Sequence, residues 1–461
     1  MARTRTPAHM RKISAFLLAL ALLAGCMGFG VRAAGPEVTR VVTTFYDKGA
    51  QGFHWYTAED GDSIVTIGSK TYAGTSVKYQ DLYAHSVVAE GLAPGTAYTY
   101  RIGDYTGNFK TDPGRGAPVD FIVTGDVQAS NADNFAYSAR TLGAAWDAFP
   151  DSDFYVTLGD FTNECDDEQW DLYFDAFKNI NSKSALVPIA GNHDGNLKWG
   201  WFANMFTLRQ QPRSVSLTGV FYSFDYGDAH IAVLNSNDMY PMSMQQRNWL
   251  INDMSRSDAK WKLVFVHRAC YSAGNDGILP DNLLMRRALI PLFDELGIDL
   301  AMNGHDHQYY RSEPVKADKV VGAASQTGTS YTDAKGTVYI MPGAAANKRY
   351  AVQEPMLPTV RSNSVIHEDP GKPVYTHISI DGGTLRYAAY TLDPATGESE
   401  EYDTLELKKT SFSAPDPNYK DRPTDYVTTF PGHVWNFVSE LFSVLIFDYL
   451  FALLPGAIAA G

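Results

Sequence analysis

The stretch Leu186-Val187-Pro188-Ile189-Ala190-Gly191-Asn192-His193-Asp194 sets the pattern of this 461-residue chain, because an apolar run ends in glycine and polar side chains of metal-binding type follow. A short apolar run of this kind is typical of a buried strand. The same pattern places Asp126 after residues 121–125 and Asp160 after residues 154–159. In α/β sheets the ligand site lies outside the carboxyl ends of the strands. We therefore expect these side chains to meet at one sheet edge.

Two later apolar runs bring histidines to the same edge. His267 follows residues 263–266, and His305 and His307 follow residues 300–304. One such residue alone carries little weight, since Asp after a strand is often a helix N-cap and a lone His is more often a core or surface residue. Five strand ends in sequence that all deliver Asp, Asn or His predict a metal site.

The hydrophobic pattern divides the chain into two folded regions. Residues 36–112 contain short β-branched and aromatic runs between Gly, Asp and Pro turns, which is typical of a small all-β sandwich. After a turn-rich linker, residues 119–405 alternate apolar strands with segments of helical period, which predicts an α/β layered domain. The predicted strands are 38–45, 53–56, 63–67, 96–102, 119–124, 153–158, 185–190, 229–234, 262–267, 298–303 and 337–341, and the predicted helices are 131–149, 167–181, 243–256 and 282–296.

The ordered motifs G-D, G-D-x-x-N, G-N-H-D, V-H and G-H-D-H resemble those of the calcineurin-like metallophosphoesterase superfamily, and specifically its purple-acid-phosphatase-like branch. Residues 87–101 also resemble a fibronectin type III-like module, which that branch commonly carries before its catalytic domain. Residues 222–230 and 305–311 look like the family as well. The resemblance implies a layered β-sandwich flanked by helices over residues 119–405 and covers residues 36–405.

The resemblance also implies a chemistry in which two metal ions clamp the reacting oxygens of an in-line displacement and a metal-bound hydroxide attacks phosphorus. Mixed carboxylate, amide and imidazole ligands suit Mn, Fe or Zn. His193 is implied to contact the phosphate and to help protonate the leaving oxygen, and Asp194 to orient it. The implied ligands are the bridging Asp160, Asp126 and His307 for the first ion, and Asn192, His267 and His305 for the second.

Four positions depart from the family pattern or stay open. Asn163 stands where purple acid phosphatases have the Tyr that gives their colour, so no purple band is expected. Gln128 stands where many members have a His, and it either supplies an oxygen to the first ion or is a solvent-facing loop amide. Arg268 and Tyr271 follow the V-H motif and either contact substrate or serve the fold.

Three functions are consistent with these residues. The leading hypothesis is an exported phosphatase that hydrolyses phosphate monoesters. The second is a phosphodiesterase or nucleotide hydrolase on the same metal centre. The third is a surface-attached binding module with a vestigial metal site, against which the complete ligand set argues.

The first 33 residues read as an export signal, with four basic residues followed by a short apolar run. Leu23-Ala24-Gly25-Cys26 resembles a lipobox that would lipidate Cys26, whereas Val31-Arg32-Ala33 resembles an ordinary cleavage site. Either alternative places the protein in the cell envelope or outside the cell. In such a compartment Cys165 and Cys270 either pair or remain buried thiols.

The net charge is −14, from 38 basic and 52 acidic residues. This surface repels a phosphate backbone, so no nucleic-acid partner is expected, and the expected substrate is a small phosphate ester. Residues 406–432 are predicted to form a polar linker. The hydrophobic tail at 433–461 is predicted to form an interfacial or short membrane helix, to dock on the protein or a sister chain, or to be disordered.

Overall fold

The computed structural model of the chain describes residues 37–195, 201–209, 220–237, 242–274, 277, 280–321, 329–353, 356–412 and 414–443. The chain divides into Met1–Glu37 and one compact unit, Val38–Gly461, to which all elements below belong. The predicted export signal and the predicted tail beyond Ser443 lie outside the described residues.

The N-terminal region is a sandwich of two sheets, as the alternating runs predicted. Every strand predicted there is present, and four further strands complete the two sheets. The region contains β1 (Thr39–Asp47), β2 (Ala50–Thr57), β3 (Ile64–Ile67), β4 (Lys70–Ala73), β5 (Thr75–Tyr79), β6 (Leu82–Glu90), β7 (Ala97–Ile102) and β8 (Tyr105–Lys110).

The second region is a mixed α/β layered domain, also as predicted. Its strands are β9 (Val119–Thr124), β10 (Phe154–Thr157), β11 (Ala185–Pro188), β12 (Tyr222–Tyr226), β13 (Ala229–Leu234), β14 (Trp261–Val266), β15 (Leu300–Met302), β16 (Tyr309–Ser312), β17 (Val315–Lys316), β18 (Lys319–Val320), β19 (Ser330–Thr332), β20 (Val338–Pro342), β21 (Ser364–Glu368), β22 (Val374–Asp381), β23 (Thr384–Leu392) and β24 (Ser399–Lys408). Its helices are α2 (Ala132–Ala148), α3 (Asp167–Asn181), α4 (Asn192–Gly195), α5 (Trp201–Met205), α6 (Met244–Arg256), α7 (Pro280–Leu296), α8 (Pro358–Asn363) and α9 (Tyr426–Ser443).

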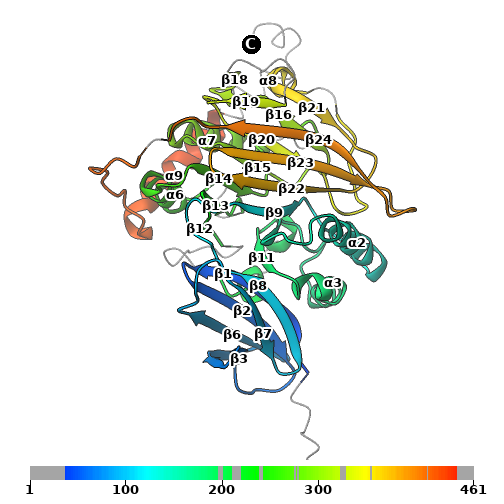
Figure 1. The fold of residues 1–461 in the computed structure, drawn as a ribbon. Helices are drawn as coiled ribbons and strands as arrows, with labels where there is room; N and C mark the ends of the chain where they lie inside the picture. Colours follow the sequence, from blue (N-terminus) through cyan, green and yellow to red (C-terminus); the bar gives the residue numbers. More distant parts are fainter. Residues whose placement is uncertain are drawn as a thin grey trace, which may run out of the picture. The chain divides into compact units, whose positions relative to one another are not determined.

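Two large sheets carry the second region (Figure 1). One has seven strands in the order β12-β13-β14-β15-β20-β16-β21. The other has eleven, in the order β19-β24-β23-β22-β9-β10-β11-β1-β2-β6-β5. The larger sheet therefore runs from the catalytic region into the sandwich, because β1 pairs in parallel with β11 through Thr44 and Leu186. The sequence did not reveal this shared sheet.

Alternating side chains on the central strands place the core. On β13 and β14, Ile231, Val233 and Phe265 join the large core cluster that also contains Phe121 of the other sheet. Their sequence neighbours, such as Val264, pack instead against residues of α6 and α7. Side chains on successive strand positions point to opposite faces, so both faces of this sheet are covered.

Capping side chains fix where three helices begin. Asn131 accepts from the N–H of Asn134 at the start of α2, and Asp166 accepts from the N–H of Gln169 at the start of α3. Ser243 caps α6 in the same way. Each cap satisfies a backbone donor that the first turn leaves free. The chain therefore turns into helix soon after each strand end, and this brings the polar residues between them to one edge.

The predicted polar linker at 406–432 is wrong at both ends. Residues 406–408 belong to β24, and α9 begins at Tyr426, before the predicted start of the tail. The residues between them are anchored: the side-chain amides of Asn248 and Asn252 on α6 donate to the carbonyls of Pro423 and Arg422 at 2.7 and 2.9 Å. The polar segment before α9, which includes Arg422 and Pro423, is therefore a strap that lies on α6.

The two cysteines follow one of the two alternatives. Cys165 and Cys270 are both buried and both free thiols. The Sγ of Cys165 donates to the carbonyl of Asp194 at 2.9 Å. Burial raises the pKa of Cys270 to about 12. A buried thiol of this kind is inert.

Candidate metal centre

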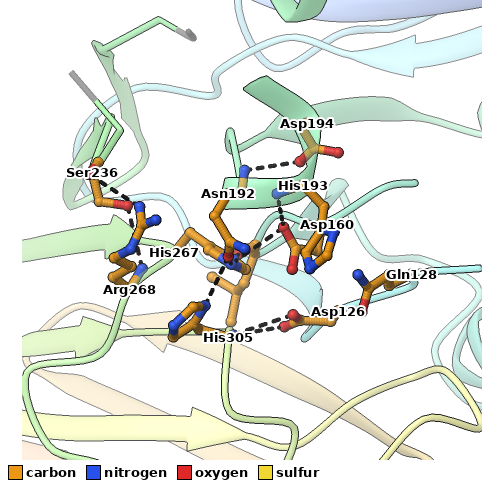
Figure 2. A network of polar contacts seen from close by, with 12 residues as sticks. Asp126, Gln128, Asp160, Asn192, His193, Asp194, Ser236, His267, Arg268 and His305 are labelled. Carbon is orange, nitrogen blue, oxygen red and sulfur yellow. Dashed lines mark hydrogen bonds and ion pairs between the residues drawn. The ribbon is translucent and has the colours of Figure 1, made fainter. Parts of the chain in front are cut away.

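Five strand ends bring the predicted residues together (Figure 2). Asp126 follows β9, Asp160 follows β10, and Asn192 begins α4 after β11. His267 follows β14, and His305 and His307 lie between β15 and β16. All except Asn192 are buried. The predicted residues thus converge, but from the carboxyl ends of strands in two sheets, whereas the sequence predicted the edge of a single sheet.

Two overlapping sets of ligand atoms lie within metal-binding reach. The first donor group is Asp126, Asp160 and His307, and the second donor group is Asp160, His267 and His305; within each, the ligand atoms lie within 4.8 Å of one another. Asp160 belongs to both. The shared carboxylate has the place that a bridge between two ions requires.

Asn192 completes the second donor group. Its Oδ1 lies 2.9 Å from Nε2 of His267 and 2.8 Å from Nδ1 of His305. Nε2 of His267 is 3.3 Å from Oδ1 of Asp160. One amide oxygen, one carboxylate oxygen and two imidazole nitrogens therefore meet at one point, a donor set that fits Mn, Fe or Zn.

Backbone carbonyls orient two of the histidines. The Nδ1–H of His267 donates to the carbonyl of Leu158 at 2.8 Å, and the Nδ1–H of His307 donates to the carbonyl of Lys348 at 2.8 Å. Each bond leaves Nε2 for the centre, and Nε2 of His307 lies 3.0 Å from Oδ2 of Asp126. Such outer hydrogen bonds fix the tautomer of metal-binding histidines. The residues present therefore fit a two-metal centre.

Backbone strain and glycine also shape the centre. Asp160, His305 and His307 all have positive φ, at 48°, 84° and 54°. Such conformations are costly for residues other than glycine and cluster at functional sites. A Cβ on Gly191 would overlap the carboxylate of Asp160, and one on Gly304 would overlap that of Asp126. The glycines of the G-N-H-D and G-H-D-H motifs are needed because the carboxylates lie against the backbone.

The charges in the centre depend on one another. Burial opposes ionisation of Asp160, but the adjacent His267 outweighs it and lowers the pKa of Asp160. Burial likewise opposes the charged form of His267, while Asp160 and Asp126 raise its pKa. Burial and the negative charge of Asp160 raise the pKa of Asp194 to about 7. Asp160 thus stays ionised at a lower pH than Asp194 does.

Asp194 and His193 have partners that differ from the implied ones. Asp194 accepts from the N–H groups of Phe161 and Gly191, both at 2.8 Å, so it fixes the loops beside Asp160 and does not orient His193. The Nδ1–H of His193 donates instead to the carbonyl of Asn163 at 2.7 Å, and its backbone N–H donates to Oδ1 of Asp160 at 2.9 Å. His193 therefore lies beside the centre, and Nε2 is the ring nitrogen that is not bonded to Asn163.

Gln128 fits neither of the two alternatives for it. Its side chain is buried, so it is no solvent-facing amide, and its Oε1 accepts from Nζ of Lys348 at 2.9 Å. Its Nε2 donates to Oδ1 of Asn163 at 3.1 Å. The amide oxygen that was predicted as a metal ligand is thus bound by an ammonium group.

The side chains of Arg268 and Tyr271 have different surroundings in the structure. The guanidinium of Arg268 donates to Oδ1 of Asn237 at 2.6 Å, and Asn237 donates in turn to the carbonyl of Gly191 (Figure 2 shows the nearby Ser236). Arg268 therefore supports the loop that carries Asn192. Tyr271 is buried and its hydroxyl donates to Asp318 at 2.7 Å, which makes it part of the fold.

Sequence reasoning missed Lys348 and Tyr350. Lys348 holds His307 through its carbonyl and Gln128 through its ammonium group. The ring of Tyr350 stacks on that of His307 at 4.8 Å. Neither residue lies at a strand end that a motif marks. Tertiary contact brings the segment after β20 to the centre, where the Ala345 N–H donates to the carbonyl of Asp126.

Comparison with known proteins gives the same family. The profile of the family Calcineurin-like phosphoesterase matches residues 119–309. Purple acid phosphatase 21 of Arabidopsis thaliana is 28% identical over 329 residues, which cover 64% of this chain and 68% of that protein. Acid phosphatase type 7 of Danio rerio is 23% identical over 413 residues, covering 77% of this chain and 88% of that protein.

A solved structure agrees with the fold. The purple acid phosphatase PPD1 of yellow lupin superposes with a TM-score of 0.70 at 17% identity, covering 81% of this chain and 75% of that one. The matched part of this chain spans about two thirds of its Arabidopsis relative. Residues 119–309 thus match a calcineurin-like phosphoesterase domain, and together with the purple acid phosphatase relatives this match supports a phosphoester hydrolase.

Proposed function

We propose that this protein is an exported phosphatase that hydrolyses small phosphate monoesters at a two-metal centre. The observation that carries the proposal is the pair of donor groups that share Asp160. When bound, two ions supply Lewis acidity and an activated water for an in-line displacement. Every ligand implied by the motifs is present, which argues against a vestigial binding module.

His193 is the proton-transfer residue of the proposal. Its Nδ1–H is held by the carbonyl of Asn163, so Nε2 is the atom that can hold a proton for the leaving oxygen. A leaving alkoxide requires such a proton. The backbone N–H of His193 donates to Asp160, and this bond keeps the imidazole next to the metal ligands.

Positive side chains beside the centre support a monoester substrate. The ammonium group of Lys348 lies against Gln128, two residues beyond Asp126. The guanidinium of Arg268 bonds Asn237, which donates to the carbonyl of Gly191 beside Asn192. A monoester carries up to two negative charges near neutral pH, and a diester carries one. Added cations at the donor groups therefore favour the monoester.

The deciding experiment compares a chromogenic phosphate monoester with its diester analogue on protein loaded separately with Mn, Zn and Fe. We expect metal-dependent monoester turnover that falls by about three orders of magnitude in Asp160→Asn, because the shared ligand is lost. Asp175→Asn, an exposed Asp on α3, is the matched control and should keep full activity. Faster diester turnover would reassign the substrate class, and metal binding without any turnover would favour the binding module.

Export rests on residues 1–33, whose charged and apolar segments support the proposal. We expect the mature chain to begin either at a lipidated Cys26 or after Ala33. The intact mass of protein recovered from the producing cells distinguishes these two forms. A mature chain that retains Met1 would contradict export through this segment.

A further inference from the structure

One side of α9 is docked on the protein. Thr429 and His433 are buried, and α9 contacts α6 and α7. Asp425 caps the helix by accepting from the N–H of Thr428 at 2.7 Å. The strap before it is held to α7 by an ion pair between Arg422 and Glu295 at 3.0 Å. Contacts on this face therefore hold α9 in position.

The other side of α9 exposes large apolar side chains. Val427 is 83% exposed, Trp435 73% and Phe442 63%. They recur with the spacing i, i+7, i+8, i+11 and i+15 of a single helical stripe. The stripe consists of Val427, Val434, Trp435, Val438 and Phe442, with Phe430 beside it.

This stripe differs from the rest of the described surface. Elsewhere the exposed large hydrophobic side chains of the described residues are scattered singly: Ile64, Val77, Val320 and Phe412. Scattered apolar residues are normal on a protein surface, whereas a contiguous patch marks an interaction site. The buried face of α9 is already occupied, so the stripe is available to something outside the described chain.

The sequence beyond the helix and the charge of the chain indicate the occupant. After Ser443 the sequence continues with Val444-Leu445-Ile446-Phe447 and remains mostly apolar to Leu454. A second copy would bring another net charge of −14, whereas a zwitterionic lipid surface brings none. Trp is also enriched where protein meets the membrane–water boundary.

We propose that the outward stripe of α9 binds the surface of a zwitterionic lipid bilayer. None of the described helices is long and apolar enough to cross a membrane. The stripe carries no charged side chain, so binding depends on apolar contact and is independent of anionic lipid. The helix then holds the catalytic domain at a membrane, and this association is separate from phosphatase activity.

A fluorescent probe at the stripe tests the proposal on the full chain. Val438→Cys, in a background of Cys26→Ala, is labelled with an environment-sensitive dye; Cys165 and Cys270 are buried. Val77→Cys, at an exposed position in the sandwich, carries the same label as control. We expect phosphatidylcholine vesicles to shift the emission of the probe at 438 to the blue and to leave the probe at 77 unchanged. An unchanged probe at 438 would overturn the proposal.

A matched pair of variants measures the contribution of the stripe. Val427→Ser with Val438→Ser should weaken partition into phosphatidylcholine vesicles about tenfold or more. Val77→Ser with Val320→Ser makes the same chemical change at exposed sites elsewhere and should not. Equal partition of the two variants would overturn the proposal. So would a dimer in solution that the first variant abolishes while vesicles leave the probe at 438 unchanged, an outcome that assigns the stripe to a second copy.

Discussion

Asp160 has several structural roles in the candidate metal centre. It belongs to both donor groups, it has positive φ, and it accepts the backbone N–H of His193. Its own loop is held by the carboxylate of Asp194. A substitution at Asp194 should therefore disturb Asp160 indirectly, through the position of the loop.

Lys348 is predicted to raise the affinity for the phosphate substrate. Lys348→Met removes a positive charge beside Gln128 and keeps the carbonyl that orients His307. We expect the KM for a monoester to rise about tenfold with kcat less affected, because one partly exposed charge contact is lost. Lys78→Met, at an exposed lysine of the sandwich, is the control. An equal fall in kcat with unchanged KM would assign Lys348 to the chemical step.

The residue at position 163 determines what visible absorption we expect from iron-loaded protein. Asn163 donates to Glu164 and accepts from Gln128, and it offers no phenolate to a metal. We expect no visible charge-transfer band from iron-loaded protein, measured by absorption spectroscopy. A band that disappears in Tyr350→Phe would contradict this expectation, because the ring of Tyr350 stacks on His307.

At the scale of elements, periodicity located most of the second region. The predicted strands at 119–124 and 229–234 and the predicted helix at 167–181 have the observed bounds. Apolar runs with clear flanking turns gave these elements, and the motifs at their ends gave the metal centre. Other features had no local signal. β22 to β24 alternate like surface strands, and their place beside β9 depends on long-range pairing.

The contacts between distant residues at the metal centre also had no local signal in the sequence. The contact between Gln128 and Lys348 joins positions 220 residues apart, and the shared sheet depends on β1 reaching β11. Single-sequence spacing gives the ends of strands. It does not give the partners that tertiary packing brings to those ends, so the bond between Gln128 and Lys348 was not predicted.

The hairpin of β12 and β13 contains a charge cluster with a pH signature. His230 lies 2.7 Å from both Asp225 and Asp253. Burial opposes its charged form, but the two carboxylates outweigh it and raise the pKa of His230 to about 9. A raised folded-state pKa stabilises the fold below the unfolded value of 6.5, and this contribution is lost as the pH rises through about 9.

His230→Gln tests this cluster. The shift corresponds to about 3 kcal/mol of unfolding free energy, so the variant should be destabilised by about that amount at pH 6 and by much less at pH 10. Urea unfolding at the two pH values measures the difference. His367→Gln on β21, whose ring contacts the hydroxyl of Ser364, is the matched control for the loss of a histidine side chain. A pH-independent effect of His230→Gln would mean that packing, and not charge, matters at this position.

At the scale of the whole molecule, the sandwich and the catalytic region form one unit. β1 lies between β11 and β2 in one sheet. Arg40 on β1 is buried and bonds Asp167 and Asp171 of α3 at 3.0 and 2.7 Å. Phe45 stacks on Phe224 at 4.9 Å. Contacts on β1 thus link the sandwich to a helix and to the second sheet.

This linkage predicts cooperative unfolding. Hydrogen exchange in urea, read separately on peptides covering β2 and β10, should report the same opening free energy, because neither part retains its sheet without the other. Arg40→Met should lower both values together by about 1–3 kcal/mol. Arg101→Met on β7, at an exposed position, should change neither. Opening of β2 at a much lower free energy than β10 would show two independent domains.

The shared sheet also bears on how such a protein can be cut or recombined. A domain joined by a flexible linker folds independently, so it can be removed or exchanged. Here, removal of residues 38–112 would strip β1 from β11 and turn an internal strand, Ala185–Pro188, into an open edge. Unprotected edges template intermolecular pairing. The same strand leads into Asn192, so we expect a shortened chain to aggregate through the strand that positions one of its candidate metal ligands.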